Sequence, residues 1–191
     1  MRHSPFTVVY DACVLYPAPL RDLLVRLGLS GCFRARWSAQ IHDEWRRNLL
    51  RNRPDLTSMQ VERTSGLMDR AIPDALVSGH EHLVAGLHLP DPDDRHVLAA
   101  AIRCHASVIV TFNEKDFPHE ALFQLGIEAQ HPDVFIDNLF DLDPAVVIGA
   151  AQRQRAQLKA PPIDVDLYLE ILLRQGLVQT TKLLTPYRAI L

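Results

Sequence analysis

The sequence predicts an α/β fold in which a parallel sheet is covered by helices on both faces. Short runs rich in β-branched residues, such as 6–10 and 107–111, alternate with longer segments whose apolar residues recur at helical spacing. This alternation is typical of parallel sheets. Hydrophobic residues make up 48% of the 191 residues, a proportion that excludes a disordered chain. The length fits one domain with a small appendage.

The first elements are expected to be a strand, a helix, a second strand and a second helix. The β-branched run at 6–10 predicts the first strand, and the leucine-rich residues 20–29, after a turn that contains proline, predict the first helix. Residues 33–37 predict the second short strand. Ser38 is then a favourable N-cap for a helix that runs to residue 48 or 49.

Three more helices are expected before the next strand. Pro54 interrupts the helical periodicity, which returns at 59–72 and again at 74–87. The segment 90–105 is the clearest of the three, because proline and acidic residues stand in its first turn, where both are favoured.

Two strands and a helical extension complete the predicted chain. Residues 107–111 indicate a buried strand and residues 126–129 one more short strand. From Pro132 onward the chain is expected to be helical. Helical segments are predicted near 132–140, 143–158 and 164–175. We therefore divide the chain into a domain at 1–140 and a helical C-terminal extension at 141–191.

Charge is distributed unevenly along the chain. Residues 1–53 hold nine arginines and four acidic residues, residues 54–143 hold five basic and sixteen acidic residues, and residues 144–191 hold six basic and three acidic residues. Six of the arginines fall between positions 34 and 53. A solvated helix face would explain these arginines equally well. An acidic centre beside an arginine-rich flank is nevertheless what an enzyme that cuts nucleic acid requires.

Acidic residues recur where hydrophobic segments end. Asp11 follows the first strand directly and Asp116 follows the strand at 107–111, so both are expected near the carboxyl edge of a parallel sheet, where ligands bind. Glu44 shares the inward face of its helix with Ile41, where a carboxylate must be paired, protonated or bound to metal. Carboxylates gathered in one crevice repel each other unless a hard cation such as Mg²⁺ or Mn²⁺ offsets their charge.

These acidic residues also have a purely structural interpretation. Asp11 alone could cap the following turn, and Glu44 could pair with a nearby arginine. Helical phase separates the three aspartates near residue 90. Asp94 points toward the buried face, Asp91 is suited to capping, and Asp93 is rotated away by about 100°. Capping therefore explains Asp91 well and Asp94 poorly.

Four sequence features occur in a fixed order along the chain. They are VVYDACVL around Asp11, Glu44 on an early helix, DPDDRHVLAAA from Asp91, and VTFNEKDF around Asp116. The combination resembles the PIN domain family, and in particular the VapC-like toxins of bacterial toxin–antitoxin pairs. The resemblance covers about residues 6–140, and its last two segments are the most specific.

The resemblance implies a three-layer α/β/α sandwich and a Mg²⁺- or Mn²⁺-dependent endoribonuclease that leaves 5′-phosphate and 3′-hydroxyl ends. It assigns the catalytic and metal-binding roles to Asp11, Glu44, Asp94 and Asp116. The supporting residues would be Asn113, Asp93 and Asp91. The candidates for holding RNA are Arg46, Arg47 and Arg51. A toxin of this kind would act on RNA and would require a cognate antitoxin, because an uninhibited ribonuclease would arrest its host.

Three positions depart from the family pattern. Cys13 stands where a hydroxyl residue or Asn is common, Arg95 stands where Asp or Asn is common, and Asn113 stands where some relatives have Asp. The sequence leaves open how many carboxylates bind metal, and whether Asp93 or Asp94 reaches it.

Other functions have less support in the sequence. An aspartyl-phosphate phosphatase usually has a second Asp two residues after the first, where this chain has Cys13, and no glycine-rich nucleotide-binding motif is present. The nine histidines form no zinc motif, and His42 and His96 are expected to be exposed without a special role. The alternative from another class is a PIN-like module that binds RNA or a protein without cutting.

The sequence further predicts a cytoplasmic protein without a membrane span. No apolar run approaches the roughly 20 residues that a span needs, the start of the chain is not a signal peptide, and the three cysteines show no close pair. Apolar residues near the C-terminus would either cover the protein's own core or form a groove for an antitoxin helix or a homodimer face. They are Leu167, Ile171, Leu172, Leu177 and Leu184.

Overall fold

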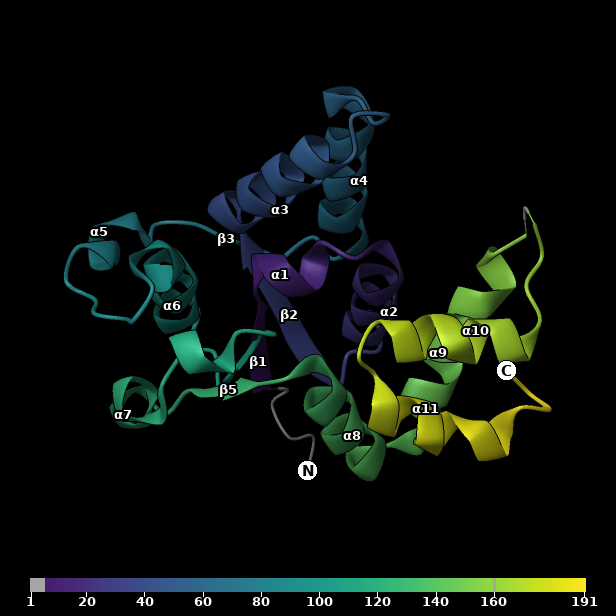
Figure 1. The fold of residues 1–191 in the computed structure, drawn as a ribbon. Coiled ribbons are helices and arrows are strands. Elements are labelled where there is room, and N and C mark those ends of the chain that lie inside the picture. Colours follow the sequence, from purple (N-terminus) through teal and green to yellow (C-terminus); the bar gives the residue numbers. More distant parts are fainter. Residues whose placement is uncertain (1–5, 160) are drawn as a thin grey trace.

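The computed structural model describes residues 6–159 and 161–191 (Figure 1). Within these residues, five parallel strands form one sheet in the order β3-β2-β1-β4-β5. The strands are β1 (Phe6–Tyr10), β2 (Phe33–Ser38), β3 (Leu76–Val77), β4 (Val108–Val110) and β5 (Glu128–Gln130). The predicted parallel sheet is confirmed. The segment 1–5, where we sought a signal peptide, lies outside the described residues.

β1 lies at the centre of the sheet because its residues are apolar on both faces. Val8, Val9 and Tyr10 are fully buried, and Val8 pairs with Ala35 of β2 on one side and with Val108 of β4 on the other. A strand that is covered on both faces is expected to be a continuous apolar run. Since all strands run in the same direction, the residues that follow them meet at one edge.

Helices cover both faces of this sheet. The helices before residue 130 are α1 (Ala12–Leu15), α2 (Ala18–Gly28), α3 (Ala39–Asn52), α4 (Ser58–Ala71), α5 (Glu81–Val84), α6 (Arg95–Arg103) and α7 (His119–Leu122). Three 3-10 turns accompany them: η1 (Pro92–Asp94), η2 (Glu114–Asp116) and η3 (Phe123–Leu125). In Figure 1, α2 lies on one side of β1 and β2, and α6 lies on the other. The fold is the expected three-layer α/β/α sandwich.

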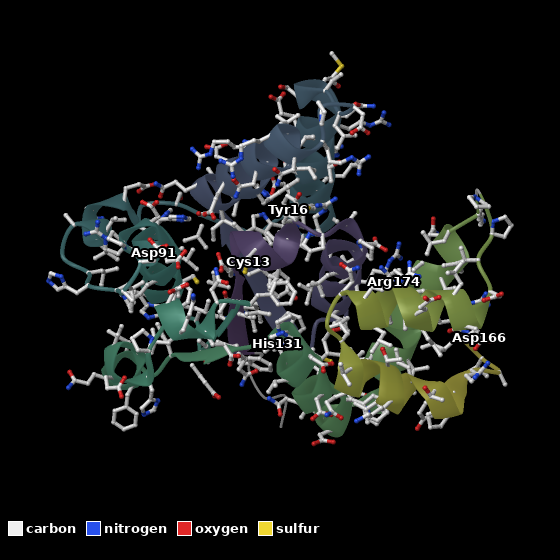
Figure 2. The ribbon with its side chains drawn as sticks, in the orientation of Figure 1. Cys13, Tyr16, Asp91, His131, Asp166 and Arg174 are labelled. Atoms are coloured by element: carbon white, nitrogen blue, oxygen red, sulfur yellow. The ribbon has the colours of Figure 1, made fainter. Side chains whose placement is uncertain are left out.

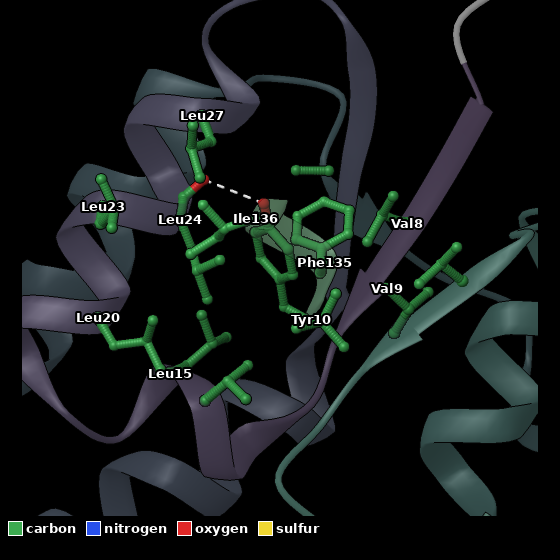
Figure 3. Close-up of a cluster of buried hydrophobic side chains, with 14 of the residues drawn as sticks. Val8, Val9, Tyr10, Leu15, Leu20, Leu23, Leu24, Leu27, Phe135 and Ile136 are labelled. Atoms are coloured by element: carbon green, nitrogen blue, oxygen red, sulfur yellow. Dashed lines mark hydrogen bonds between the residues drawn. The ribbon is translucent and has the colours of Figure 1, made fainter. Parts of the chain in front are cut away.

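The core on the α2 side fixes the position of β1 (Figure 3). The hydroxyl of Tyr10 donates a hydrogen bond to the carbonyl oxygen of Leu24, at 3.0 Å. The ring of Tyr10 meets Phe135 of α8 (Pro132–Leu142) edge-on, with 6.4 Å between the ring centroids. Burying one large apolar side chain contributes about 1.5–3 kcal/mol. The residue after Tyr10, which is Asp11, is therefore held by a rigid strand.

The C-terminal extension packs on the domain itself. It contains α9 (Pro144–Gln157), α10 (Val165–Arg174), α11 (Val178–Leu184) and the turn η4 (Thr185–Tyr187), and α9 packs against α2. Leu172, Leu177 and Leu184 are buried in the core, as the first of the two interpretations predicted. Leu167 is 39% exposed and Ile171 is partly exposed. None of the described helices is both long enough and apolar enough to cross a bilayer.

Most predicted elements are confirmed, and Ser38 caps α3 by accepting a hydrogen bond from the N–H of Ile41 at 3.1 Å. The helix predicted at 74–87 is wrong. Leu76 and Val77 form β3 at the sheet edge, and the positive φ of Gly79 (74°) separates this strand from the short helix α5. The helix predicted at 90–105 is the turn η1 followed by α6, which ends at Arg103.

Candidate functional site

Asp11 and Thr111 lie side by side at the carboxyl edge of the sheet. Tyr10 of β1 pairs with Val110 of β4, and the N–H of Asp11 donates to the carbonyl oxygen of Val110 at 3.1 Å. The residues that follow both strands are thereby in register. The hydroxyl of Thr111 donates to Oδ2 of Asp11 at 2.7 Å. Thr111 is a buried site residue that the sequence did not reveal.

Asp11 is a buried carboxylate with three hydrogen-bond donors. It is 2% exposed. Besides Thr111, the N–H of Ala12 donates to its Oδ1 at 2.6 Å, and the thiol of Cys13 donates to its Oδ2 at 3.1 Å. Burial raises the pKa of Asp11, with the charge of Glu44 acting in the same direction, while the three hydrogen bonds oppose the rise. Asp11 therefore caps α1, as the structural interpretation required, and faces other carboxylates as well.

Cys13 fills the position where the family commonly has a hydroxyl residue or Asn. Figure 2 shows it near the centre of the molecule, with Asp91 to its left. Its Sγ accepts a hydrogen bond from the N–H of Phe112 at 3.2 Å and lies 3.3 Å from Oγ1 of Thr111. Burial raises the pKa of the thiol well above its ordinary value, so Cys13 is a neutral donor to Asp11. The thiol takes the place of a hydroxyl here.

Asp94 has an unpaired carboxylate oxygen. The residue is 7% exposed, and its Oδ2 is buried without a hydrogen-bond partner among the described residues. Burial raises the pKa of Asp94 to about 7, and the nearby charges of Asp11, Asp91, Glu44 and Asp116 add to the effect. The five carboxylates therefore belong to one electrostatic neighbourhood, which is formed by the end of β1, α3, η1 with its N-cap, and η2.

The neighbouring aspartates take the orientations that helical phase predicted. The carboxylate of Asp91 caps η1 by accepting the N–H of Asp93 at 2.9 Å. Asp93 is exposed, whereas Asp94 is buried. Of this pair, Asp94 is the one that faces Asp11.

Glu44 forms a hydrogen bond with a histidine. The alternative that it pairs with a nearby arginine is wrong. Oε2 of Glu44 lies 3.1 Å from Nε2 of His96 in α6. The side chain of His96 is 12% exposed, so the expectation of an exposed residue without a role is wrong. Helical spacing does not indicate its direction, because residues two apart, such as Asp94 and His96, lie on different faces of a helix. The partner on α3 could not be predicted from local sequence.

His42 is also buried, contrary to expectation. Its Nε2 lies 3.0 Å from Oδ1 of Asp69, and its Nδ1 accepts a hydrogen bond from the indole N–H of Trp45 at 2.9 Å. Burial lowers the pKa of His42, although the hydrogen bond to Asp69 opposes this. A neutral imidazole that joins α3 to α4 is a structural element of the core.

Asp116 and Asn113 border the site on the turn η2. Asp116 is half-buried, and its charge contributes to the raised pKa of Asp94. Asn113 is exposed, and its N–H donates to Oγ1 of Thr111 at 3.0 Å. Through Thr111, this turn is therefore linked to Asp11.

A polar groove of about 740 Å³ runs along α3, and of the candidate acidic residues Glu44 and Asp93 line it, whereas Asp11, Asp94 and Asp116 do not. Glu44 of α3 and His96 of α6 line it together with Asp93 of η1. Arg47 and Arg51 line it farther along α3. The other residues that line the groove are Gln40, Asp43, Asn48, Val84 and Pro92.

Arg46 contacts α4 and its own helix, unlike Arg47 and Arg51, the other two RNA-binding candidates, which line the groove. Its guanidinium donates to the hydroxyl of Ser65 at 3.1 Å and pairs with Asp43. It is not among the residues that line the groove. Arg47 and Arg51 are thus the candidates that the fold brings beside the acidic residues.

The donor set fits a divalent cation that keeps part of its hydration shell. In the described part of the chain, no group of three or more His, Cys, Asp or Glu side chains converges as a ready ligand set. Mg²⁺ needs no such cage, since it usually keeps several waters and binds one or two carboxylates. Asp11 and Asp94 supply hard oxygen ligands, and the unpaired Oδ2 of Asp94 is costly without a cation.

Models of two known protein families match this chain. The model of the PIN domain family matches residues 7–115, a span that includes Asp11, Glu44 and Asp94. The chain belongs to the PIN domain family. The model named "VapC50 C-terminal domain" matches residues 132–186, so the second match starts with α8, before the predicted boundary at 140. Asp116 lies one residue beyond the first match.

The chain is also similar to one curated protein of Mycobacterium tuberculosis, "Putative ribonuclease VapC50". The two are 44% identical over 79 residues, which are 39% of this chain and 46% of that protein. The match therefore spans less than half of the relative's length. Together with the two family matches, it supports the resemblance to VapC-like proteins. No solved structure matches the chain.

Proposed function

We propose that this protein is a Mg²⁺- or Mn²⁺-dependent endoribonuclease that hydrolyses phosphodiester bonds in RNA and acts as the toxin of a toxin–antitoxin pair. One observation carries the proposal. Asp94 is buried with an unpaired oxygen in an electrostatic neighbourhood that it shares with Asp11, Glu44 and Asp116, and a groove with arginines lies beside it. The names of the matching family and relative support the same activity.

The acidic residues take different parts in this proposal. Asp11 and Asp94 hold the cation, and Glu44 and Asp116 add negative charge from two sides. Asp91 fixes η1 by capping it, Asp93 lines the groove, and Asn113 orders the turn after β4. The cation, when bound, activates a water molecule and neutralises the charge of the scissile phosphate.

The protein side chains would prepare this reaction in three ways. The hydrogen bonds from Thr111 and Cys13 keep Asp11 in one orientation. Burial and the neighbouring carboxylates raise the pKa of Asp94 to about 7 in the absence of a cation, so a cation that binds there displaces a proton. Arg47 and Arg51 hold the RNA backbone in the groove.

Single-stranded or looped RNA is the substrate form that we propose, because its bases and backbone are accessible to side chains. The antitoxin, a homodimer, the cytoplasmic location and the domain division at 140 are further parts of the proposal. They follow from the VapC-like resemblance and from the sequence.

The test is RNA cleavage by the purified protein with Mg²⁺, with Mn²⁺ and with EDTA. We expect cleavage only with a divalent cation and a loss of at least about 100-fold in Asp11→Asn and Asp94→Asn. Asp141→Asn, at an exposed position of α8, is the matched control and should cleave normally. Cleavage in EDTA, or equal cleavage by the two site variants, would contradict the proposal. A wild-type protein that binds RNA without cutting it would favour the binding-module alternative.

A further inference from the structure

His96 connects the two segments that carry Glu44 and Asp94. It lies in the first turn of α6, two residues after Asp94, while Glu44 lies on α3, 52 residues earlier in the chain. The helices α3 and α6 pack against each other, and the Nε2–Oε2 distance of 3.1 Å joins the two side chains. The contact thus depends on the tertiary fold.

The direction of this hydrogen bond follows from its two partners. An ionised carboxylate only accepts hydrogen bonds, so Nε2 of His96 carries the proton and donates it. The other ring nitrogen, Nδ1, is buried and has no hydrogen-bond partner within the described residues. The contact to Glu44 is therefore the polar contact that orients the imidazole ring.

Glu44 has a competing partner on its own helix. Its side chain is 30% exposed, and Arg47 stands three residues later on the same groove. Opposite charges at this spacing attract each other. Arg46 is already paired with Asp43. Without His96, the carboxylate of Glu44 would be free to turn along the groove toward Arg47.

In the present orientation Glu44 acts on both central aspartates. Its carboxylate contacts His96, two residues after Asp94, and lines the same groove as Asp93, and its charge adds to the raised pKa of both Asp11 and Asp94. A residue that fixes Glu44 there determines how much negative charge a cation meets at Asp11 and Asp94.

We propose that His96 is a positioning residue that holds the Glu44 carboxylate toward Asp11 and Asp94 and thereby strengthens binding of the divalent cation. This inference rests on the proposed function. His96 itself need not touch the cation or the RNA. Residues that orient metal-site carboxylates typically affect metal affinity or activity by about 10–100-fold.

The test compares His96→Ala with His96→Gln, since the glutamine amide can donate from nearly the same place as Nε2. Calorimetric titration with Mn²⁺ in the absence of RNA measures the affinity directly. We expect Mn²⁺ affinity to fall about 10–100-fold in His96→Ala and to return to within about threefold of wild type in His96→Gln. RNA cleavage by His96→Ala should need more Mn²⁺ and should recover at saturating Mn²⁺. His82→Ala, an exposed histidine on α5, is the control.

The outcomes separate the inference from the proposed function. Thermal unfolding checks that each variant is folded. If His96→Ala is not folded, the Mn²⁺ affinity of His96→Gln compared with that of wild type decides whether the inference holds. The positioning role is overturned if folded His96→Ala binds Mn²⁺ as tightly as wild type. It is also overturned if folded His96→Gln binds Mn²⁺ at least about 10-fold more weakly than wild type. Either result leaves the proposed function intact. If the wild type neither binds Mn²⁺ nor cleaves RNA, the proposed function fails first and the inference fails with it.

Discussion

Asp94 is buried next to other carboxylates, and this arrangement costs stability in the absence of a cation. Its pKa is raised to about 7 because burial and the charges of Asp11, Asp91, Glu44 and Asp116 disfavour ionisation. In the unfolded chain an aspartate has a pKa of about 3.9. Between these two values the folded protein binds more protons than the unfolded chain. The contribution of Asp94 to stability is therefore largest below about pH 4 and is lost as the pH rises through about 7.

Replacement of Asp94 should therefore stabilise the metal-free protein. A shift of one pKa unit corresponds to about 1.4 kcal/mol, so we expect Asp94→Asn to raise the free energy of unfolding at pH 8 by at least about 1 kcal/mol. The gain should be smaller at pH 5.5, where the wild-type carboxyl is mostly protonated. Urea unfolding in EDTA at the two pH values measures both quantities. A variant that is less stable than wild type at pH 8 would contradict this explanation.

The roles of single residues could be predicted only where local geometry determines them. Helical phase distinguished Asp94 from Asp93, and strand position located Asp11. Thr111 and His96 were missed because each acquires its role from a partner about 50 to 100 residues away, Asp11 or Glu44. Such pairs depend on the register of β1 and β4 and on the packing of α3 against α6.

At the scale of elements, a buried carboxylate joins the extension to the domain. Asp133 of α8 is 6% exposed and accepts the N–H groups of Gln179 and Thr180, at 2.8 and 2.9 Å, and the hydroxyl of Thr180 at 2.7 Å. Both N–H groups belong to the first turn of α11, which needs external acceptors. Asp133 thus caps a helix to which it does not belong.

Removal of this carboxylate should loosen the extension. Asp133→Ala leaves two N–H groups and a hydroxyl without their acceptor, so we expect a loss of about 2–4 kcal/mol in the free energy of unfolding. Guanidinium unfolding followed by circular dichroism measures the loss. Asp137→Ala, a half-buried position one turn farther along α8, is the control. A loss below about 0.5 kcal/mol for Asp133→Ala would show that α11 is held by its leucines alone.

The sequence predicted elements well where their apolar pattern was long. The strand 6–10 and the helices after Ser38 and Pro132 are close to their predicted bounds. It failed for β3, because two residues carry no periodicity and Leu76 and Val77 become a strand only by pairing with Trp37 and Ser38. The short helices α1 and α7 were missed for the same reason.

At the scale of the whole molecule, charge separates into an acidic middle and an arginine-rich start. The residues 54–143 carry sixteen acidic and five basic residues, while residues 1–53 carry nine arginines. The fold brings these regions together, since Arg47 and Arg51 of α3 share a groove with Asp93 and His96. The cation would offset the repulsion between the acidic centre and RNA phosphates.

RNA affinity should therefore depend on salt through these two arginines. Binding of single-stranded RNA releases about 0.7 counterions per phosphate contact, so we expect Arg47→Ala and Arg51→Ala each to reduce the slope of log affinity against log salt by about 0.7. Fluorescence anisotropy with Ca²⁺ in place of Mg²⁺, from 50 to 300 mM salt, measures the slope. Arg174→Ala, an exposed residue on α10, is the control. If all three variants have the wild-type slope, RNA does not follow this groove.

The central claim is that Asp11 and Asp94 hold a divalent cation, and the most direct measurement is a crystal structure of the wild-type protein soaked in Mn²⁺. We predict an anomalous difference peak within about 2–2.5 Å of carboxylate oxygens of Asp11 and Asp94, which is absent from Asp94→Asn crystals soaked in the same way. A clear Mn²⁺ peak elsewhere on the protein, with none at Asp11 and Asp94, would contradict the account.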